Sequence, residues 1–285
     1  MESNTKYALL IGINYFGTSA ELGGCHSDIL DVNSYLSKIG YKPENIIIML
    51  DKSEKALHNS PTASGLSFQL SSERIPTRGN IVSAMNECVQ KCKNGDTLYV
   101  HYSGHGSNRT DEFNGDEQDR IDECICPSDY AINGMIYDDE MRIVMVNALS
   151  SGVKLRVVFD SCHSGSALDL PFIYGIHTPS GDSISQENNN MLNKDVIFIS
   201  GCKDPQTSAD SQFDGHPNGA LTYYLLKALN KIQTITCMTK KKECRYTFKD
   251  LLDLTRLELK KNGYTQIPQL GMAKKIQLHE IVDIL

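Results

Sequence analysis

The sequence lacks the features that mark several large classes of protein. No apolar run approaches the roughly 20 residues that cross a bilayer, so we expect no membrane partner. Basic residues are not in surplus: 28 Lys and Arg stand against 35 Asp and Glu, a net charge of −7. Nucleic acid is therefore not an expected partner. The start of the chain shows no signal peptide with a cleavage pattern, which favours a cytoplasmic protein.

Several catalytic and structural motifs are also missing. The nine cysteines include no C-x2-C pair, and their odd number favours free thiols over a disulfide framework or a structural zinc site. The P-loop pattern G-x-x-x-x-G-K-[ST] is absent, which excludes that class of NTPase. A serine hydrolase using Ser103 or Ser164 would need a G-x-S-x-G elbow, and none is present.

What remains is ordinary globular composition, with 40% apolar and 22% charged residues, arranged as strands alternating with helices. Strands are predicted over 6–13, 45–50, 96–102, 154–159, 196–200 and 269–272. Helices are predicted over 28–39, 77–92, 139–149, 220–229 and 247–261. This alternation predicts an α/β fold with a mostly parallel central sheet flanked by helices, a three-layer sandwich. Long irregular stretches are expected at 51–75, 103–123 and 169–194, and a surface loop at 236–245.

Two predicted strands end in chemically unusual residues. The third ends in His101-Tyr102-Ser103-Gly104-His105-Gly106, and the fourth in Phe159-Asp160-Ser161-Cys162-His163-Ser164-Gly165. Ligands of parallel sheets bind beyond the carboxyl ends of the strands, so both groups point to one site. A thiol beside an imidazole is an activated nucleophile, and the N–H groups of Gly106 and Cys162 are candidate donors to an oxyanion. We predict that Cys162 and His105 are catalytic. His101 is predicted to point away from the site of Ser103 and His105, and His163 away from Cys162.

Five segments of the sequence are similar to those of a known family. The segments YALLIGINYFGTSAELGGCHSDILDV, YVHYSGHG, IDECICPSDY, FDSCHSGSALDLPF and ISGCKDPQTSAD together resemble the peptidase core of metacaspases. The resemblance implies a caspase-like fold and a Cys/His endopeptidase with His105 as general base and Cys162 as nucleophile. It implies one domain over 1–285, with a large-subunit-like part (1–170), a small-subunit-like part (195–285) and mobile loops at 51–75 and 169–194. No Pro-rich or zinc-finger prodomain precedes Tyr7 and no very long linker separates the halves, so we expect a type I-like core.

Charge near the expected nucleophile predicts the substrate. Asp160 lies two residues before Cys162, and Asp28 lies near the start of the first helix. An acidic pocket favours Arg or Lys at P1, the residue before the scissile bond. The resemblance agrees and assigns Cys25, Asp28, Ser103 and Asp160 to the pocket lining. For Asp28 alone, the alternative is an ordinary acidic residue in the first turn of a helix.

A second acidic cluster follows His105 in the sequence. The many carboxylates between Asp111 and Glu140 fit either a solvated face or a site for a hard cation, and the EF-hand pattern fails. By the resemblance, Asp122, Asp138, Asp139 and Asp169 match calcium ligands, and calcium (Ca2+) is the implied cofactor.

These observations predict a calcium-stimulated cysteine endopeptidase that cleaves protein or peptide substrates after Arg or Lys. We expect a monomer that cuts itself within 51–75, which holds Lys52, Lys55 and Arg74, or at Lys240-Lys241-Lys242. The alternative from another class is a catalytically silent, calcium-binding caspase-like scaffold.

Overall fold

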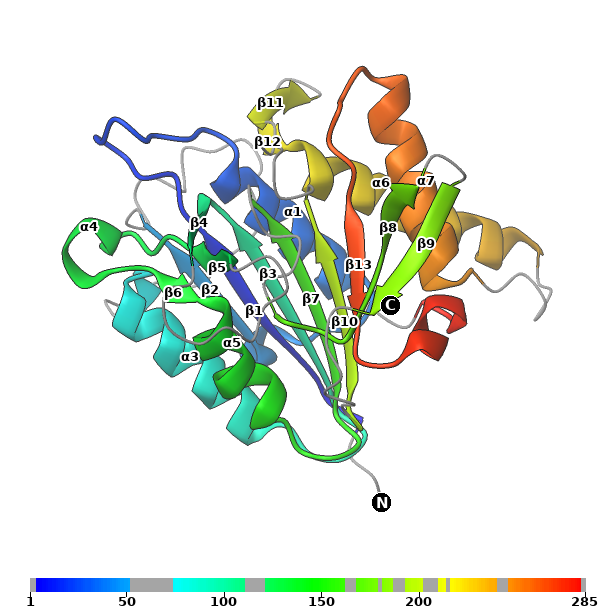
Figure 1. Cartoon of the computed structure of the whole chain (residues 1–285), viewed down its shortest axis with the longest axis horizontal. Coiled ribbons are helices and arrows are strands. Elements are labelled where there is room, and N and C mark those ends of the chain that lie inside the picture. Colours follow the sequence, from blue (N-terminus) through cyan, green and yellow to red (C-terminus); the bar gives the residue numbers. More distant parts are fainter. Residues whose placement is uncertain are drawn as a thin grey trace.

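The computed structural model describes residues 4–51, 74–110, 121–161, 168–178, 181–186, 193–201, 210–213, 216–239 and 246–282. Its centre is an eight-stranded sheet with the strand order β2-β1-β3-β7-β10-β13-β8-β9. In that order the strands are Ile46–Leu50, Lys6–Gly12, Thr97–Ser103, Lys154–Asp160, Asp195–Ser200, Gln269–Met272, Phe172–Thr178 and Gly181–Gln186. Strands β2 to β10 pair in parallel, and the pairings from β10 through β13 and β8 to β9 are antiparallel. The predicted mostly parallel sheet is confirmed (Figure 1).

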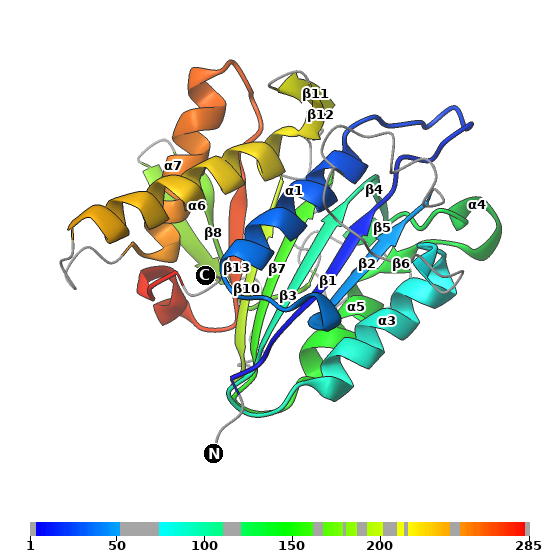
Figure 2. The same cartoon turned by 180° about the vertical axis from the view of Figure 1, so that it is seen from behind.

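Helices cover both faces of this sheet, as predicted (Figures 1 and 2). One face carries α1 (Cys25–Lys38), α6 (Ala220–Thr239) and α7 (Phe248–Lys261). The other carries α3 (Arg78–Lys91), α5 (Asp138–Met141) and the π-helical turn Arg142–Asn147. Two 3-10 turns, Pro43–Asn45 and Lys275–His279, and the short helix α4 (Tyr130–Asn133) complete the helical elements among the described residues. No helix in this described part of the chain is long and apolar enough to cross a membrane.

The alternation of side chains along β1 explains why the sheet needs two helical layers. Leu9 and Ile11 are buried in the core beneath α3, whereas Ala8 and Leu10 are buried in the core beneath α1 and α6. Successive side chains of a strand point to opposite faces, so an apolar strand such as β1 must be covered on both sides. The run of apolar residues in the sequence thus determines a central strand.

Two short sheets lie outside the main one and correct the sequence predictions. Strands β4 (Gly106–Thr110), β5 (Ile121–Ile125) and β6 (Ile136–Tyr137) form one, and β11 (Asp210–Phe213) and β12 (His216–Gly219) form the other. The stretch 103–123, predicted to be irregular, therefore contains β4 and the start of β5. The prediction for 169–194 was wrong in the same way, because β8 and β9 lie within it. Strand β8 pairs with β13, about a hundred residues later in the chain, and local pattern does not reveal such a pairing.

The predicted helices are confirmed, with changed ends. Helix α3 begins after Thr77, whose hydroxyl accepts from the N–H of Asn80, and α7 begins with a capping box made by Thr247 and Asp250. Helix α6 runs to Thr239, ten residues beyond the predicted end at 229, because no Gly or Pro interrupts that segment. The surface loop predicted from 236 is therefore wrong for 236–239.

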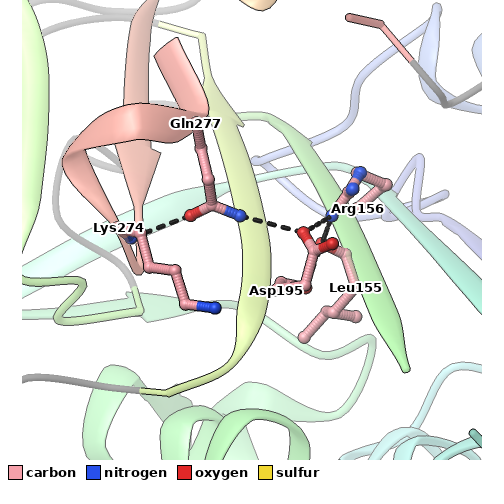
Figure 3. Close-up of polar contacts among 5 residues, drawn as sticks. All are labelled: Leu155, Arg156, Asp195, Lys274 and Gln277. Atoms are coloured by element: carbon pink, nitrogen blue, oxygen red, sulfur yellow. Dashed lines mark hydrogen bonds and ion pairs between the residues drawn. The ribbon is translucent and has the colours of Figure 1, made fainter. Parts of the chain in front are cut away.

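A buried arginine on the inner strand β7 is linked through Asp195 to the 3-10 turn Lys275–His279 near the end of the chain (Figure 3). The side chain of Arg156 on β7 is 1% exposed, and its Nη1 donates to Asp195 Oδ1 at 2.7 Å. Asp195 Oδ1 also accepts from Gln277 Nε2 at 2.9 Å, and Gln277 Oε1 accepts from the N–H of Lys274. The guanidinium lies 5.5 Å from the ring centroid of Phe248 on α7. Asp195 thus provides a carboxylate for the buried charge of Arg156.

We expect Asp195→Ala to lower the free energy of unfolding by about 3 kcal/mol, because it removes a carboxylate that is bound to a buried guanidinium. Arg156→Met should cost less, since methionine fills apolar space and Asp195 keeps its bond to Gln277. In the double variant the two losses should not add. Urea unfolding of the four proteins measures these values, and a change within about 0.5 kcal/mol for Asp195→Ala would contradict the assignment.

Candidate active site

The carboxyl ends of β1, β3 and β7 bring the predicted site residues to one edge of the sheet. In the parallel register, Gly12 lies beside Ser103, and Ser103 lies beside Asp160. Helix α1 follows β1 and places Asp28 over this row, where Ser103 Oγ donates to Asp28 Oδ2 at 2.5 Å. Three of the four predicted pocket residues are thus adjacent. The fourth, Cys25, is buried one helical turn before Asp28, and its N–H donates to Asn14 Oδ1.

Asp28 is fully buried and accepts four hydrogen bonds from three donors. Besides Ser103, Asn218 Nδ2 donates to Oδ1 at 3.1 Å, and the N–H of Gly219 lies 2.9 Å from Oδ1 and 3.1 Å from Oδ2. Burial, followed by the charge of Asp160, raises the pKa of Asp28 well above its usual range, and these donors oppose the rise. The reading of Asp28 as an ordinary first-turn acid is therefore excluded, because such residues are solvated.

Asp160 approaches Asp28 from the sheet. Its Oδ2 accepts from both the N–H and the Oγ1 hydroxyl of Thr222, each at 2.8 Å, in the first turn of α6. Gly219 lies between the two carboxylates: a Cβ at this position would lie 2.8 Å from Asp28 Oδ2 and closer still to Asp160 Oδ2. Only glycine fits here, and its lack of a side chain leaves the two acids facing each other.

Sequence reasoning missed the β12–α6 junction. Asn218 and Gly219 donate to Asp28 and Thr222 donates to Asp160, yet all three come about 60 residues or more after Asp160 in the chain. Asn-Gly directly before a predicted helix was an available N-terminus signal, but nothing in the sequence indicated which carboxylates it would meet. Helix α1 contacts β12 in the structure, which brings this junction to the acids.

His105 follows β3 and has a defined tautomer. Its Nε2 lies 2.7 Å from the carbonyl oxygen of Ala20, an atom that only accepts, so Nε2 carries the proton. Nδ1 of the neutral ring is then a proton acceptor, which is what a general base requires. The ring of His105 lies 4.7 Å from that of Tyr15, measured between centroids.

Two tyrosine hydroxyls hold the backbone of His105. The N–H of His105 donates to Tyr15 Oη at 2.9 Å, and Tyr102 Oη donates to the carbonyl of His105 at 2.6 Å. Tyr15 in turn donates to the carbonyl of Cys126 at 2.6 Å. The hydroxyls pack over Gly104, where a Cβ would lie 2.6 Å from Tyr102 Oη. Glycine at position 104 therefore leaves room for the two hydroxyls. The role of Tyr15 was not predicted, because its positive φ of 53° turns it toward His105 and the sequence does not show this backbone conformation.

The other catalytic predictions fall partly outside the described residues. Cys162 and His163 belong to the segment 162–167, which is not described. Ser161, directly before Cys162, is buried at the end of β7 beside the end of β3. Gly106, the predicted partner of Cys162 in an oxyanion hole, begins β4 opposite Ile125. The prediction that His101 points away from Ser103 was wrong: alternate residues of β3 share a face, and His101 contacts Thr222.

Two of the predicted calcium ligands, Asp122 and Asp169, act through their charge on a third, Asp138. This residue is buried, and its carboxylate accepts from the N–H groups of Glu123 and Asp139. Burial, the charge of Asp169 and that of Asp122 together raise the pKa of Asp138 to about 7. Arg142 Nη1 lies 3.9 Å from Asp169 Oδ2.

An all-carboxylate donor set fits a hard cation, which would relieve this repulsion. Asp139, the fourth predicted ligand, is exposed. Within the described ranges, no three or more His, Cys, Asp or Glu residues are arranged as a metal site.

Comparison with known proteins agrees with this arrangement. Residues 6–171 match the metacaspase, peptidase C14 domain. The chain is 34% identical to metacaspase-1A of Aspergillus oryzae, over 99% of this chain and 70% of that protein. It is 36% identical to metacaspase-1 of Cryptococcus neoformans, over 93% of this chain and 62% of that protein. Among solved structures, protein GSU0716 of Geobacter sulfurreducens shares the fold, with a TM-score of 0.62 at 21% identity and 97% coverage of both chains.

The carboxyl edge that holds His105, the buried acids beside it and the match over more than half of the chain lead to one conclusion. This chain belongs to the metacaspase family and carries its cysteine-type peptidase domain.

Proposed function

We propose that this chain is a calcium-stimulated cysteine endopeptidase that cleaves proteins after Arg or Lys. The observation that carries the proposal is the pair of buried carboxylates, Asp28 and Asp160, that face each other at the same edge of the sheet as His105. Family membership supports the peptidase chemistry. The pair supports the choice of a cationic substrate side chain.

The chemistry assigns each group one role. Nδ1 of His105 takes the proton of the Cys162 thiol, and the thiolate attacks the scissile carbonyl carbon. The N–H groups of Gly106 and Cys162 stabilise the resulting oxyanion. His105 then gives its proton to the leaving amine, which leaves a thioester on Cys162. A water molecule, deprotonated by His105, hydrolyses the thioester and restores the thiol. The carbonyl of Ala20 keeps the imidazole in the required tautomer.

Electrostatics of the pocket favour a basic P1 residue. Burial and the charge of Asp160 raise the pKa of Asp28, so the pair is poorly compensated without a cation. A guanidinium or ammonium between the acids restores both charges and gains charge-assisted hydrogen bonds, whereas an Asp side chain meets repulsion. Arg can reach both carboxylates with its planar fork, so we expect Arg to be at least equal to Lys.

Calcium would be held by Asp122, Asp138 and Asp169, with Asp139 joining them by a change of side-chain conformation. The raised pKa of Asp138 supports this set, because close carboxylates favour a divalent cation. The ion supplies no step of the peptide cleavage. A bound ion would hold Asp169, seven residues after Cys162, whose φ is 45°.

Self-cleavage is proposed for the segments 51–75 and Lys240-Lys241-Lys242, which contain basic residues. Most of the first segment and all of the second lie outside the described residues. The monomeric state and the cytoplasmic location stay predictions.

The first test concerns the nucleophile and the base. Cys162→Ala should abolish turnover of an Arg-P1 peptide and His105→Ala nearly so, because the two groups act as one unit. Both variants should also lack the self-cleavage fragments, whose new ends follow Lys or Arg, that the wild type gives. Cys202→Ala and His163→Ala are the matched controls and should keep substantial turnover. Normal cleavage by Cys162→Ala would refute the mechanism.

The second test concerns the pocket. On a peptide series varied only at P1, kcat/KM should be high for Arg and Lys and undetectable for Asp. Asp160→Ala should cost about 2–5 kcal/mol of transition-state binding for a basic P1, because it removes one of two buried anions. A small neutral P1 residue should be little affected by the same change. A preference for Asp at P1 would rule out the acidic-pocket argument.

The third test concerns calcium. Activity should rise at millimolar rather than nanomolar calcium, because the ligands come from separate segments. Asp122→Ala and Asp138→Asn should remove the response while Cys162 still reacts with a small alkylating reagent. Glu44→Ala, at an exposed acid in another element, is the control and should respond normally. Equal wild-type activity in chelator and in excess calcium would refute the role of the ion.

A further inference from the structure

A buried polar chain lies behind Asp160, on the side of the sheet covered by α6. Tyr99 Oη lies 3.1 Å from Nδ1 of His101, and Nε2 of His101 lies 3.1 Å from Thr222 Oγ1. Thr222 Oγ1 lies 2.8 Å from Asp160 Oδ2. His101 and Thr222 are 0% exposed and Tyr99 is 2% exposed, among apolar side chains of β3, β7 and α6. The chain therefore connects the core of the protein to a carboxylate of the proposed P1 pocket.

The direction of donation along this chain is fixed at the Asp160 end. Asp160 Oδ2 already accepts the backbone N–H of Thr222, which can only donate, so this oxygen is an acceptor. The single hydroxyl proton of Thr222 then points to Oδ2, and Oγ1 must accept from Nε2–H of His101. The Nδ1 atom of the neutral ring is left as an acceptor for the Tyr99 hydroxyl. Every donor in the chain thus points toward the carboxylate.

His101 acts here as a neutral donor rather than as a charge. Its burial lowers the pKa to about 3, so the ring carries one proton at any working pH. A second proton on Nδ1 would displace the bond from Tyr99 and place a charge in an apolar core. The side chain has no described contact with His105, which separates it from the proton transfer of catalysis.

A fully satisfied polar chain inside an apolar core is costly to keep for packing alone, since apolar side chains of similar size fill the same space. This series of hydrogen bonds ends on the carboxylate of Asp160, which would meet the substrate. We propose that His101 and Thr222 are specificity-positioning residues, which orient the carboxylate of Asp160 toward a basic P1 side chain. The inference rests on the proposed function and assigns a role to the first histidine of the segment HYSGHG.

The experiment compares kcat and KM for two peptides that differ only at P1, Arg or norleucine. Thr222→Val removes the hydroxyl and keeps the shape and the backbone N–H, and His101→Leu removes the donor to that hydroxyl. Both should lower the Arg-to-norleucine ratio of kcat/KM about ten-fold, with the loss mainly in KM for the Arg peptide. The norleucine peptide should change by about two-fold or less.

Matched variants separate positioning from general damage. Thr222→Ser restores the hydroxyl and should restore the ratio, and His101→Gln should restore part of it through its Nε2 donor. Thr255→Val removes another fully buried threonine hydroxyl, one that donates to a helix carbonyl in α7, and should leave the ratio unchanged. Thermal unfolding checks that each protein is folded. If His101→Leu does not fold, the near-isosteric Thr222→Val decides.

Each outcome points to one proposal. A wild type without preference for Arg over norleucine overturns the basic-P1 function itself. A wild type that prefers Arg, with unchanged ratios in Thr222→Val and His101→Leu, overturns only the positioning role. An equal loss on both peptides also overturns it, because that is the result of a purely structural chain.

Discussion

The meeting of Asp28 and Asp160 is the constraint on which the rest of this site depends. Two carboxylates buried side by side are unfavourable unless their oxygens are hydrogen-bonded. The chain satisfies them from three directions, with Ser103 on β3, Gly219 at the end of β12 and Thr222 at the start of α6. The positive end of the α6 dipole lies at the same point, which adds to the stabilisation of negative charge. Segments from both halves of the sequence must therefore fold together before the pocket exists.

The same edge of the sheet holds His105 by a different principle. Its backbone, rather than its ring, is fixed by Tyr15 and Tyr102, and the ring is oriented by the carbonyl of Ala20. The segment between β1 and α1 supplies both Tyr15 and Ala20. That one connection thus orients the base, while the helix that follows it supplies Asp28. A small change in the backbone path of this segment would therefore displace both His105 and Asp28.

The sequence was sufficient to predict the layers of the fold and the position of the pocket acids. It was insufficient to predict the residues that contact those acids and His105. Apolar runs such as β1 predict central strands, and parallel strands align their carboxyl ends, so Ser103 and Asp160 could be placed side by side. Strand β8 was missed because its pairing partner, β13, lies far along the chain. Gly219, Thr222 and Tyr15 were missed for a related reason: each acts through a long-range contact that local periodicity does not encode. His101 was misplaced although the period of two along β3 already put it on the same face as Ser103.

The most direct test of the account is the position of a P1 arginine in the pocket. A crystal structure of the protein with a peptidyl-arginine chloromethyl ketone attached to Cys162 would show it. The account predicts a guanidinium between Asp28 and Asp160, within hydrogen-bonding distance of both carboxylates, with Thr222 still donating to Asp160. A guanidinium bound elsewhere, with the two acids still facing each other without it, would contradict the central claim.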